Sequence, residues 1–267
     1  MRLLSAFLRR DFFIETSYRF AFLATLGGIL FNLLIFYFLS QFVGTAAAPY
    51  LTLYNGDYFS FVLIGIALGN YVGVGLNSFA QSLRLAQTTG TLEAMLMTPT
   101  ALPAIVTGSA AWSYVFATIR VLAYLLLGVG LAGVSFSGAN YGAAAAGLAL
   151  AIVVFASIGI IAASIIMVIK RGDPVTALFA GLNNLLGGVY YPIEVLPDWL
   201  QSIARLLPIT YALRIMRGAL LSGASWADLR TDFLILALFC VILLPVSLLT
   251  FRFAVQRARQ EGSLAHY

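Results

Sequence analysis

Charged residues are scarce in this chain, and their scarcity excludes a water-soluble protein. Asp, Glu, Lys and Arg make up only 9% of the 267 residues, whereas 61% are hydrophobic. Soluble domains carry about 25% charged residues, so this composition cannot supply a solvated surface. We therefore predict an integral membrane protein. The formal net charge of +5 then concerns membrane topology and not nucleic-acid binding, because the arginines are spread along the chain beside hydrophobic segments.

Residues that perform chemistry are nearly absent as well. The single cysteine, Cys240, has no partner for an intrachain disulfide. The single histidine, His266, lies beside the C-terminus, which excludes a serine–histidine dyad in the membrane and a histidine-based zinc site. No acidic pair shares one predicted span, and no Gly-x-x-x-x-Gly-Lys-Ser/Thr motif supplies an ATP phosphate-binding loop. We expect a protein that moves a substrate, without catalytic residues, a metal or a cofactor of its own.

Long apolar runs are what the sequence has instead. A helix needs about 20 apolar residues to cross the hydrocarbon of a membrane. The predicted fold class is an all-α integral membrane protein, a single transmembrane domain over residues 1–267. The first run begins about 19 residues into the chain and is too long for a cleavable signal peptide. Six spans are expected, at roughly 20–42, 57–80, 103–133, 142–169, 175–191 and 231–252.

Positive charges set the expected orientation. With the N-terminus inside, ten Arg and Lys residues fall on inner segments, and none falls in the first two outer loops, about 43–56 and 134–141. This is the positive-inside pattern. It places the protein in the cell inner (plasma) membrane with both termini in the cytoplasm. The exception is the segment 192–230, which six spans place outside although it holds four arginines.

The segment 192–230 is expected to form an extracytoplasmic re-entrant helix pair. Pro192, Pro197 and Pro208 interrupt it, so its sequence predicts two short amphipathic helices and not a membrane span. A dip into the outer leaflet is tolerable when the backbone hydrogen bonds are made within helices. The long side chains of this pair would then reach the outer headgroups; we expect this of Arg205, Arg214 and Arg217.

Two further helices are expected on the inner side. Residues 1–19 combine helically spaced apolar residues with a polar side, which predicts an interfacial helix; a plain membrane anchor is the alternative. The polar loop 84–99 contains a short helix with Gly90 as N-cap, Glu93 in its first turn and Pro99 as its stop. A helix that lies passively on the membrane is the alternative there.

Three stretches resemble the type-2 ABC exporter permeases. "GGVYYPIEVLPDWLQSIARLLPITYALRIMRGALL", residues 187–221, is similar to that family's signature of a Tyr-Pro, a Leu-Pro, a Pro-x-Thr/Ser-Tyr and an Arg-Gly. "TGTLEAMLMTP", residues 89–99, resembles its first cytoplasmic loop, and "LRRDFFIETSYRFAFL", residues 8–23, its interfacial helix and first span. The resemblance implies six spanning helices, a second permease copy in a homodimer or heterodimer, and two copies of a separate ATP-binding subunit that holds ATP and Mg.

The resemblance also implies roles for three groups of residues. The short helix in 84–99 would be a coupling helix, which sits in a cleft of the ATP-binding subunit and carries its motion to the spans. The pathway would lie at the dimer interface. The implied contacts with the ATP-binding subunit are Arg84, Thr88, Thr89, Gly90, Thr91, Glu93, Arg9 and Arg10; the pathway residues are Asn32, Phe36, Asn77, Asn183 and Asn184; the exit gate consists of Tyr190, Tyr191, Pro192, Glu194 and Arg120.

Arg120 is a charge inside an apolar segment. It lies about 17 residues into the third span, roughly 25 Å along the helix. Such a charge is costly near the bilayer centre. We expect Arg120 to pair with Glu194, or else with Asp57, or to snorkel outward without a protein partner.

The substrate is expected to be amphipathic, a drug or a lipid, because amides and aromatic rings would line its route. Interhelical hydrogen bonds are the other use for such amides. A lipid-linked polysaccharide is an alternative substrate of the same family. A stand-alone channel or an ion-coupled carrier is disfavoured, because the span interiors hold no carboxylate for ion coupling. A membrane enzyme is disfavoured by the missing reactive groups.

Overall fold

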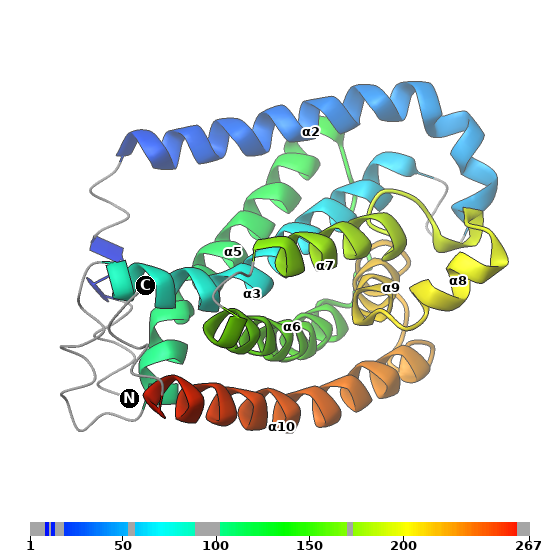
Figure 1. Ribbon diagram of the computed structural model, residues 1–267. Helices are drawn as coiled ribbons and strands as arrows, with labels where there is room; N and C mark the ends of the chain where they lie inside the picture. Colours follow the sequence, from blue (N-terminus) through cyan, green and yellow to red (C-terminus); the bar gives the residue numbers. More distant parts are fainter. Residues whose placement is uncertain are drawn as a thin grey trace.

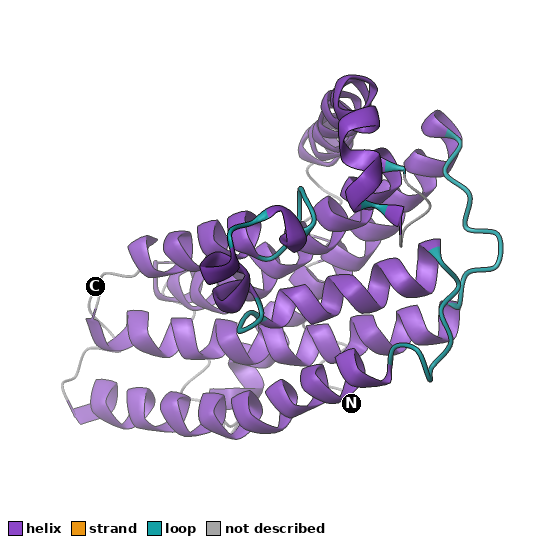
Figure 2. Ribbon diagram, turned by 90° about the vertical axis from the view of Figure 1, so that its right-hand side faces the viewer, coloured by secondary structure: helices purple, strands orange, loops and turns teal. Residues whose placement is uncertain are grey.

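The computed structural model describes residues 9–10, 12–13, 19–52, 57–88, 102–169 and 173–260. Within these ranges the chain is helical and has no strand, and short loops join the helices (Figure 2). The long helices are α2 (Arg19–Ala47), α3 (Tyr58–Thr88), α5 (Leu102–Ala132), α6 (Tyr141–Ile169) and α10 (Arg230–Gln260). The shorter elements are η1 (Ala48–Tyr50), α7 (Asp173–Leu186), η3 (Ile193–Val195), α8 (Asp198–Ala204) and α9 (Pro208–Leu221).

Among the helices of the described ranges, five are long and apolar enough to cross a membrane: α2, α3, α5, α6 and α10. The all-α, multi-pass membrane fold predicted from the composition is thereby confirmed. Each of the five contains an apolar stretch of at least 22 residues, or about 33 Å of helix. That length suffices for a hydrocarbon core of about 30 Å.

The predicted fifth span, 175–191, is a shorter helix than expected. It forms α7, whose 14 residues measure about 21 Å. The helix ends at Leu186 because two glycines follow. Gly188 has a φ of 79°, a left-handed conformation that favours glycine, and a Cβ on Gly187 would lie 2.3 Å from the carbonyl oxygen of Asn183. Long helices alone therefore do not give the predicted count of six spans.

The helices alternate in direction along the bundle. In Figure 1, α2 begins and α10 ends at the left, and α7 runs from the left, where α6 ends, toward α8 and α9 at the right. The end of α3 lies at the left as well. One end of the bundle thus carries α8 and α9, and the other carries the ends of α3 and α10.

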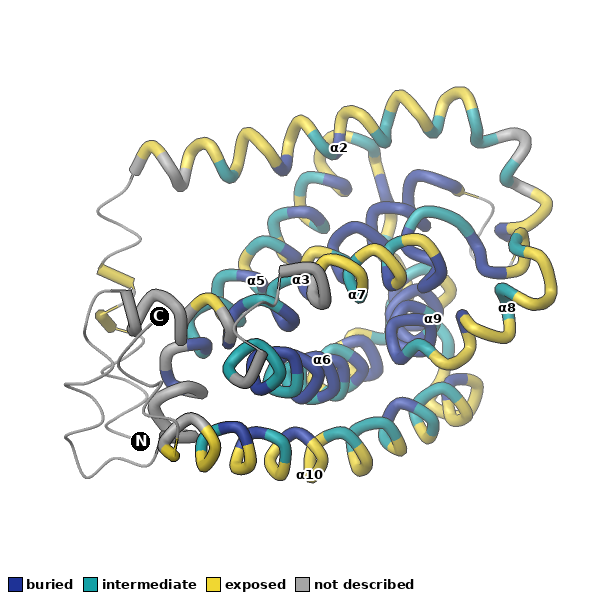
Figure 3. Tube along the Cα trace, in the orientation of Figure 1, coloured by how far each residue is buried: buried dark blue, intermediate teal, exposed yellow. Residues whose placement is uncertain are grey.

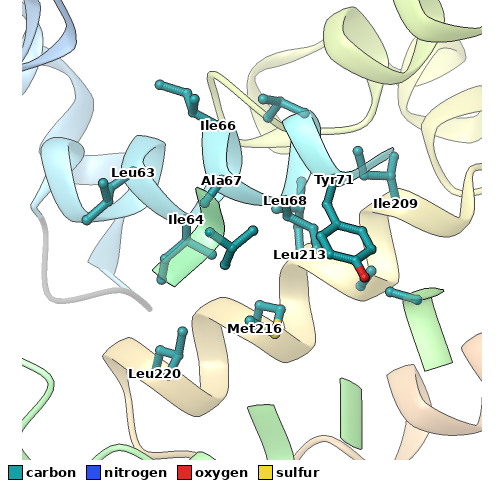
Figure 4. Close-up of a cluster of buried hydrophobic side chains, with 14 of the residues drawn as sticks. Leu63, Ile64, Ile66, Ala67, Leu68, Tyr71, Ile209, Leu213, Met216 and Leu220 are labelled. Carbon is teal, nitrogen blue, oxygen red and sulfur yellow. The ribbon is translucent and has the colours of Figure 1, made fainter. Parts of the chain in front are cut away.

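The core is built around α3 and α9. Figure 3 shows both as largely buried, whereas α2 and α10 expose most of their length. Apolar side chains of α3 face those of α9 across this core (Figure 4). Small residues set the helix contacts: a Cβ on Gly159 of α6 would lie 2.0 Å from the carbonyl oxygen of Gly75 in α3. Gly159 therefore allows α6 to pack closely on α3.

The segment 192–230 contains the two predicted short helices, α8 and α9, but α9 is not a surface helix. Nearly all its side chains are buried, and it packs against α3, α6 and α10. Arg205 is exposed, as expected. Arg214 is partly exposed and lies 3.6 Å from Glu194 and 3.8 Å from Asp232, so it joins α9 to η3 and α10.

The expectation that Arg217 reaches outer headgroups is wrong. Its side chain is only 4% exposed. Its Nε donates to the carbonyl oxygen of Phe61 at 3.1 Å, and its two Nη atoms donate to the carbonyls of Gly188 at 2.8 Å and Val189 at 3.1 Å. Its guanidinium also lies 3.4 Å from the ring centroid of Phe61. Because α7 stops at Leu186, the following carbonyls have no helical partner, and Arg217 supplies their donors.

Candidate functional site

A half-open cavity of about 540 Å³ lies between helices of the bundle. Its walls come from α2, α3, α5, the end of α7 and the stretch that follows α7. Four segments that are far apart in sequence therefore meet there. The lining residues are Asn32, Ile66, Gly69, Asn70, Gly73, Val74, Asn77, Ser78, Gln81, Trp112, Ser113, Phe116, Arg120, Asn184, Val189 and Tyr190.

One face of α3 supplies the polar floor of the cavity. Asn70, Gly73 and Asn77 are spaced by three and four residues, which places them on the same side of a helix. The amide of Asn70 donates to the carbonyl oxygen of Ile66 at 3.0 Å, and that of Asn77 to the carbonyl oxygen of Gly73 at 2.9 Å. These bonds to the preceding turn fix both side chains. The glycine between them leaves room above the helix.

Arg120 of α5 carries the charge in this cavity. Its guanidinium lies 4.6 Å from the ring centroid of Phe116, four residues earlier on the same helix. A cation–π contact contributes about 0.5–2 kcal/mol, whereas a charge at the centre of a spanning helix costs about 2.5–3.5 kcal/mol on insertion scales. The ring therefore offsets only part of this cost.

The predicted ion pair of Arg120 is wrong. Within the described ranges, no carboxylate lies within 4.0 Å of its guanidinium. Glu194 is engaged by Arg214, and Asp57 accepts hydrogen bonds from the backbone N–H groups of Phe59 and Ser60, both at 3.1 Å. Both carboxylates thus have other partners, and Arg120 faces the cavity instead of η3.

Buried polar atoms without a hydrogen-bond partner gather at this cavity. Among the described residues they include Asn32 Oδ1, Trp112 Nε1 and Arg120 Nε, and all three residues line the cavity. Protein interiors satisfy about 90% or more of their buried polar groups. In this place, water or a polar ligand would supply the missing hydrogen bonds.

Most of the predicted pathway residues meet at the cavity. Asn32, Asn77 and Asn184 line it. Phe36 does not, but its ring stacks on that of the lining residue Tyr190, with centroids 5.5 Å apart and planes 4° from parallel. Asn183 is buried, and its amide donates to the carbonyl oxygen of Phe179 at 2.8 Å. The structure brings these residues together, and their role in transport stays a prediction.

The predicted exit gate is dispersed over α5, the stretch after α7, and η3. The carbonyl oxygen of Tyr190 accepts a hydrogen bond from the hydroxyl of Tyr58 at 3.1 Å. The hydroxyl of Tyr191 donates to the carbonyl oxygen of Leu185. Pro192 is buried and directly precedes η3. Of the gate residues, Tyr190 and Arg120 line the cavity, and Tyr191, Pro192 and Glu194 do not.

The predicted contacts with an ATP-binding subunit are only partly described. Arg9 and Arg10 are exposed, and Arg9 lies 5.7 Å from the ring centroid of Phe13. Arg84 and Thr88 belong to the last turns of α3. Thr89, Gly90, Thr91 and Glu93, and with them the coupling helix, lie outside the described residues.

Sequence reasoning missed the aromatic wall of the cavity. Trp112 and Phe116 of α5 stack with centroids 6.5 Å apart, and Phe12 meets Trp112 edge to face at 5.7 Å. The available signal was the spacing of four between Trp112, Phe116 and Arg120, which puts all three on one helix face.

Comparison with known proteins agrees with this architecture. A family model described as ABC-2 type transporter matches residues 3–221. This stretch contains every residue that lines the cavity and all the helices from α2 to α9. No curated protein matches the chain.

Proposed function

The chain belongs to the ABC-2 type transporter family, and from this membership we propose that it is the membrane-spanning subunit of an ATP-driven exporter. A separate ATP-binding subunit, present in two copies, hydrolyses ATP with Mg. The chain itself performs no hydrolysis, because its sequence has no phosphate-binding loop. It forms the route of the substrate through the membrane together with a second permease chain.

The observation that carries the proposal is the polar cavity inside an apolar bundle. Polar side chains within membrane spans usually face protein or a water-filled path. Here Asn32, Asn77 and Asn184 come from three different helices and face one space of about 540 Å³. Such a mixture of amides and aromatic rings suits an amphipathic substrate, a drug or a lipid. A lipid-linked polysaccharide is the second candidate.

A six-pass topology follows if α7 and the stretch after it cross together. In Figure 1 the chain enters α2 and leaves α10 at the same end of the bundle, which requires an even number of passes. The 14 residues of α7 cover about 21 Å, and residues 187–191 extend the path toward η3. Both termini are then cytoplasmic, and the protein lies in the cell inner membrane, consistent with its inner arginines.

The helices α8 and α9 then lie at the extracytoplasmic end. The helix α8 exposes Trp199, and Leu206, two residues after its end, is exposed as well. Trp is enriched where a membrane meets water, so we place α8 in the outer leaflet as the re-entrant part of the segment 192–230. The buried α9 anchors it to the bundle.

The test is purification of the chain with and without the ATP-binding protein encoded beside it. The chain alone should not hydrolyse ATP, and the complex should hydrolyse it in detergent or lipid nanodiscs. Robust hydrolysis by the chain alone would overturn the proposal. Ion conductance by the chain alone in planar bilayers would overturn it in favour of a channel.

A further inference from the structure

The charge balance of the cavity points to the sign of its ligand. Among the described residues that line it, Arg120 is the charged one. No described carboxylate neutralises it within 4.0 Å, and its Nε is buried without a partner. An unneutralised guanidinium in a partly enclosed site repels cations and attracts anions. The cavity is therefore built for a negative group.

The hydrogen-bonding groups agree with the charge. Trp112 Nε1 can only donate, and it too is buried without a partner. Asn77 gives one amide N–H to the carbonyl oxygen of Gly73 and keeps the other. The amide of Asn70 already donates to Ile66 and Tyr124. The unpartnered atom of Asn32 is the acceptor Oδ1. A planar guanidinium binds the oxygens of phosphate or carboxylate in a bidentate manner. The donors of Arg120 and Trp112 on α5, with the remaining N–H of Asn77 on α3, thus border a place for an oxyanion.

The surroundings indicate an apolar tail. The cavity borders α2, whose Phe31 and Phe38 are largely exposed, and its lining residue Tyr190 stacks on Phe36 of α2. A volume of 540 Å³ lies in the range of small-molecule sites, about 300–1,000 Å³. It accommodates a headgroup while a tail extends along the apolar faces of the helices.

We infer that this cavity binds the phosphate or carboxylate headgroup of an amphipathic anion, with Arg120 as its counter-ion. The inference rests on the proposed function and narrows the substrate to amphipathic anions. The same chemistry is offered by an anionic phospholipid of the membrane and by a free alkyl phosphate that enters from it. The experiment separates these two sources.

The experiment uses Trp112 as its reporter. The sequence has three tryptophans, and Trp199 and Trp226 are exposed residues outside the cavity. The double variant Trp199→Phe, Trp226→Phe leaves Trp112 as the sole tryptophan. The full-length chain is placed in phosphatidylcholine nanodiscs and titrated with dodecyl phosphate or with uncharged dodecyl glucoside. In a second arm, the fraction of phosphatidylglycerol in the nanodisc is raised instead.

We expect the fluorescence emission of Trp112 to change saturably with dodecyl phosphate, with phosphatidylglycerol, or with both. Saturation by dodecyl phosphate assigns the site to a free amphiphile, and saturation by phosphatidylglycerol assigns it to a membrane lipid. Arg120→Gln should weaken the anion about tenfold or more, since charge-assisted hydrogen bonds are lost. Arg120→Lys should retain part of the affinity, and Arg214→Gln, whose arginine lies outside the cavity, should match the parent.

Two outcomes would overturn the inference. The first is that the chain with Trp112 as its sole tryptophan binds dodecyl phosphate and dodecyl glucoside equally tightly and does not respond to phosphatidylglycerol. This comparison does not require any variant of a cavity residue to fold. The other is an unchanged anion affinity in a folded Arg120→Gln chain. Because the ATP-binding subunit takes no part in this measurement, its result is independent of whether the assembled complex hydrolyses ATP.

Discussion

Arg217 should be the most sensitive arginine at the end of the bundle that carries α8 and α9, and its replacement should give a measurable loss of stability. The side chain is 4% exposed and donates to three backbone carbonyls, those of Phe61, Gly188 and Val189. Arg217→Met keeps an apolar stem but leaves these carbonyls without donors. A buried group left unsatisfied costs about 1–3 kcal/mol. Because the losses are not additive, we expect about 3–5 kcal/mol in total.

Arg214→Met is the matched control on the same helix. Arg214 is partly exposed, and its ion pairs with Glu194 and Asp232 measure 3.6 and 3.8 Å. Such pairs contribute about 0–1 kcal/mol. Arg217→Lys is the second control: it retains the charge, but an ammonium group lacks the fixed fork that reaches several carbonyls at once. Its stability should lie between that of the wild type and that of Arg217→Met.

The assay is thermal unfolding in detergent, followed by a dye that reacts with the single cysteine, Cys240, as it becomes accessible. For a protein of this size, 1 kcal/mol corresponds to roughly 2–4 °C in Tm. Arg217→Met should therefore lower Tm by about 6–20 °C, and Arg214→Met, which loses two ion pairs, by no more than about 8 °C. Equal Tm values for the two methionine variants would refute the assignment of Arg217 as the residue that joins α9 to α3 and to the end of α7.

Three further predictions follow from particular contacts and from the sequence. Gly65→Ala should lower Tm or abolish folding, because the new Cβ would lie 1.9 Å from the carbonyl oxygen of Val189. Gly130→Ala is the control and should leave Tm unchanged, because no atom lies within 4 Å of its Cβ. Equal Tm changes in the two variants would contradict the packing of α3 against the stretch after α7. Asp232→Asn should lower Tm by no more than about 2–4 °C, because it removes one partly exposed ion pair of Arg214. A decrease in Tm of more than about 10 °C would contradict the small stabilisation expected of this pair. Glu93→Ala and Gly90→Pro should leave ATP binding by the assembled complex intact but abolish transport, because they alter the proposed coupling helix; wild-type transport by both would remove that role.

The sequence predicted the fold class and most helices because their signal is local. Long apolar runs are independent of tertiary packing, so α2, α3, α5, α6 and α10 appear where composition places them. The length of α7 was overestimated because apolarity continues to Tyr191 while the backbone turns at Gly188. Hydropathy reports burial in lipid or protein alike, and only the two glycines indicate where the helix ends.

The arginines show why the site was harder to predict than the fold. Arg214 and Arg217 are three residues apart on one helix, yet the first lies at the surface in ion pairs and the second is buried against carbonyls. Arg120 lies within a long apolar helix, as predicted, but was assigned the wrong neighbours. The direction in which a side chain points depends on how its helix is rotated in the bundle, and hydropathy does not determine that rotation.

ATP-driven transport in proteoliposomes tests the central claim most directly. The chain is reconstituted with its ATP-binding subunit, and ATP added outside drives those complexes whose ATP-binding subunit faces outward. The account predicts that a fluorescent alkyl phosphate accumulates inside the vesicles only with hydrolysable ATP and only when both proteins are present. Accumulation that proceeds without ATP, or with the chain alone, would contradict it.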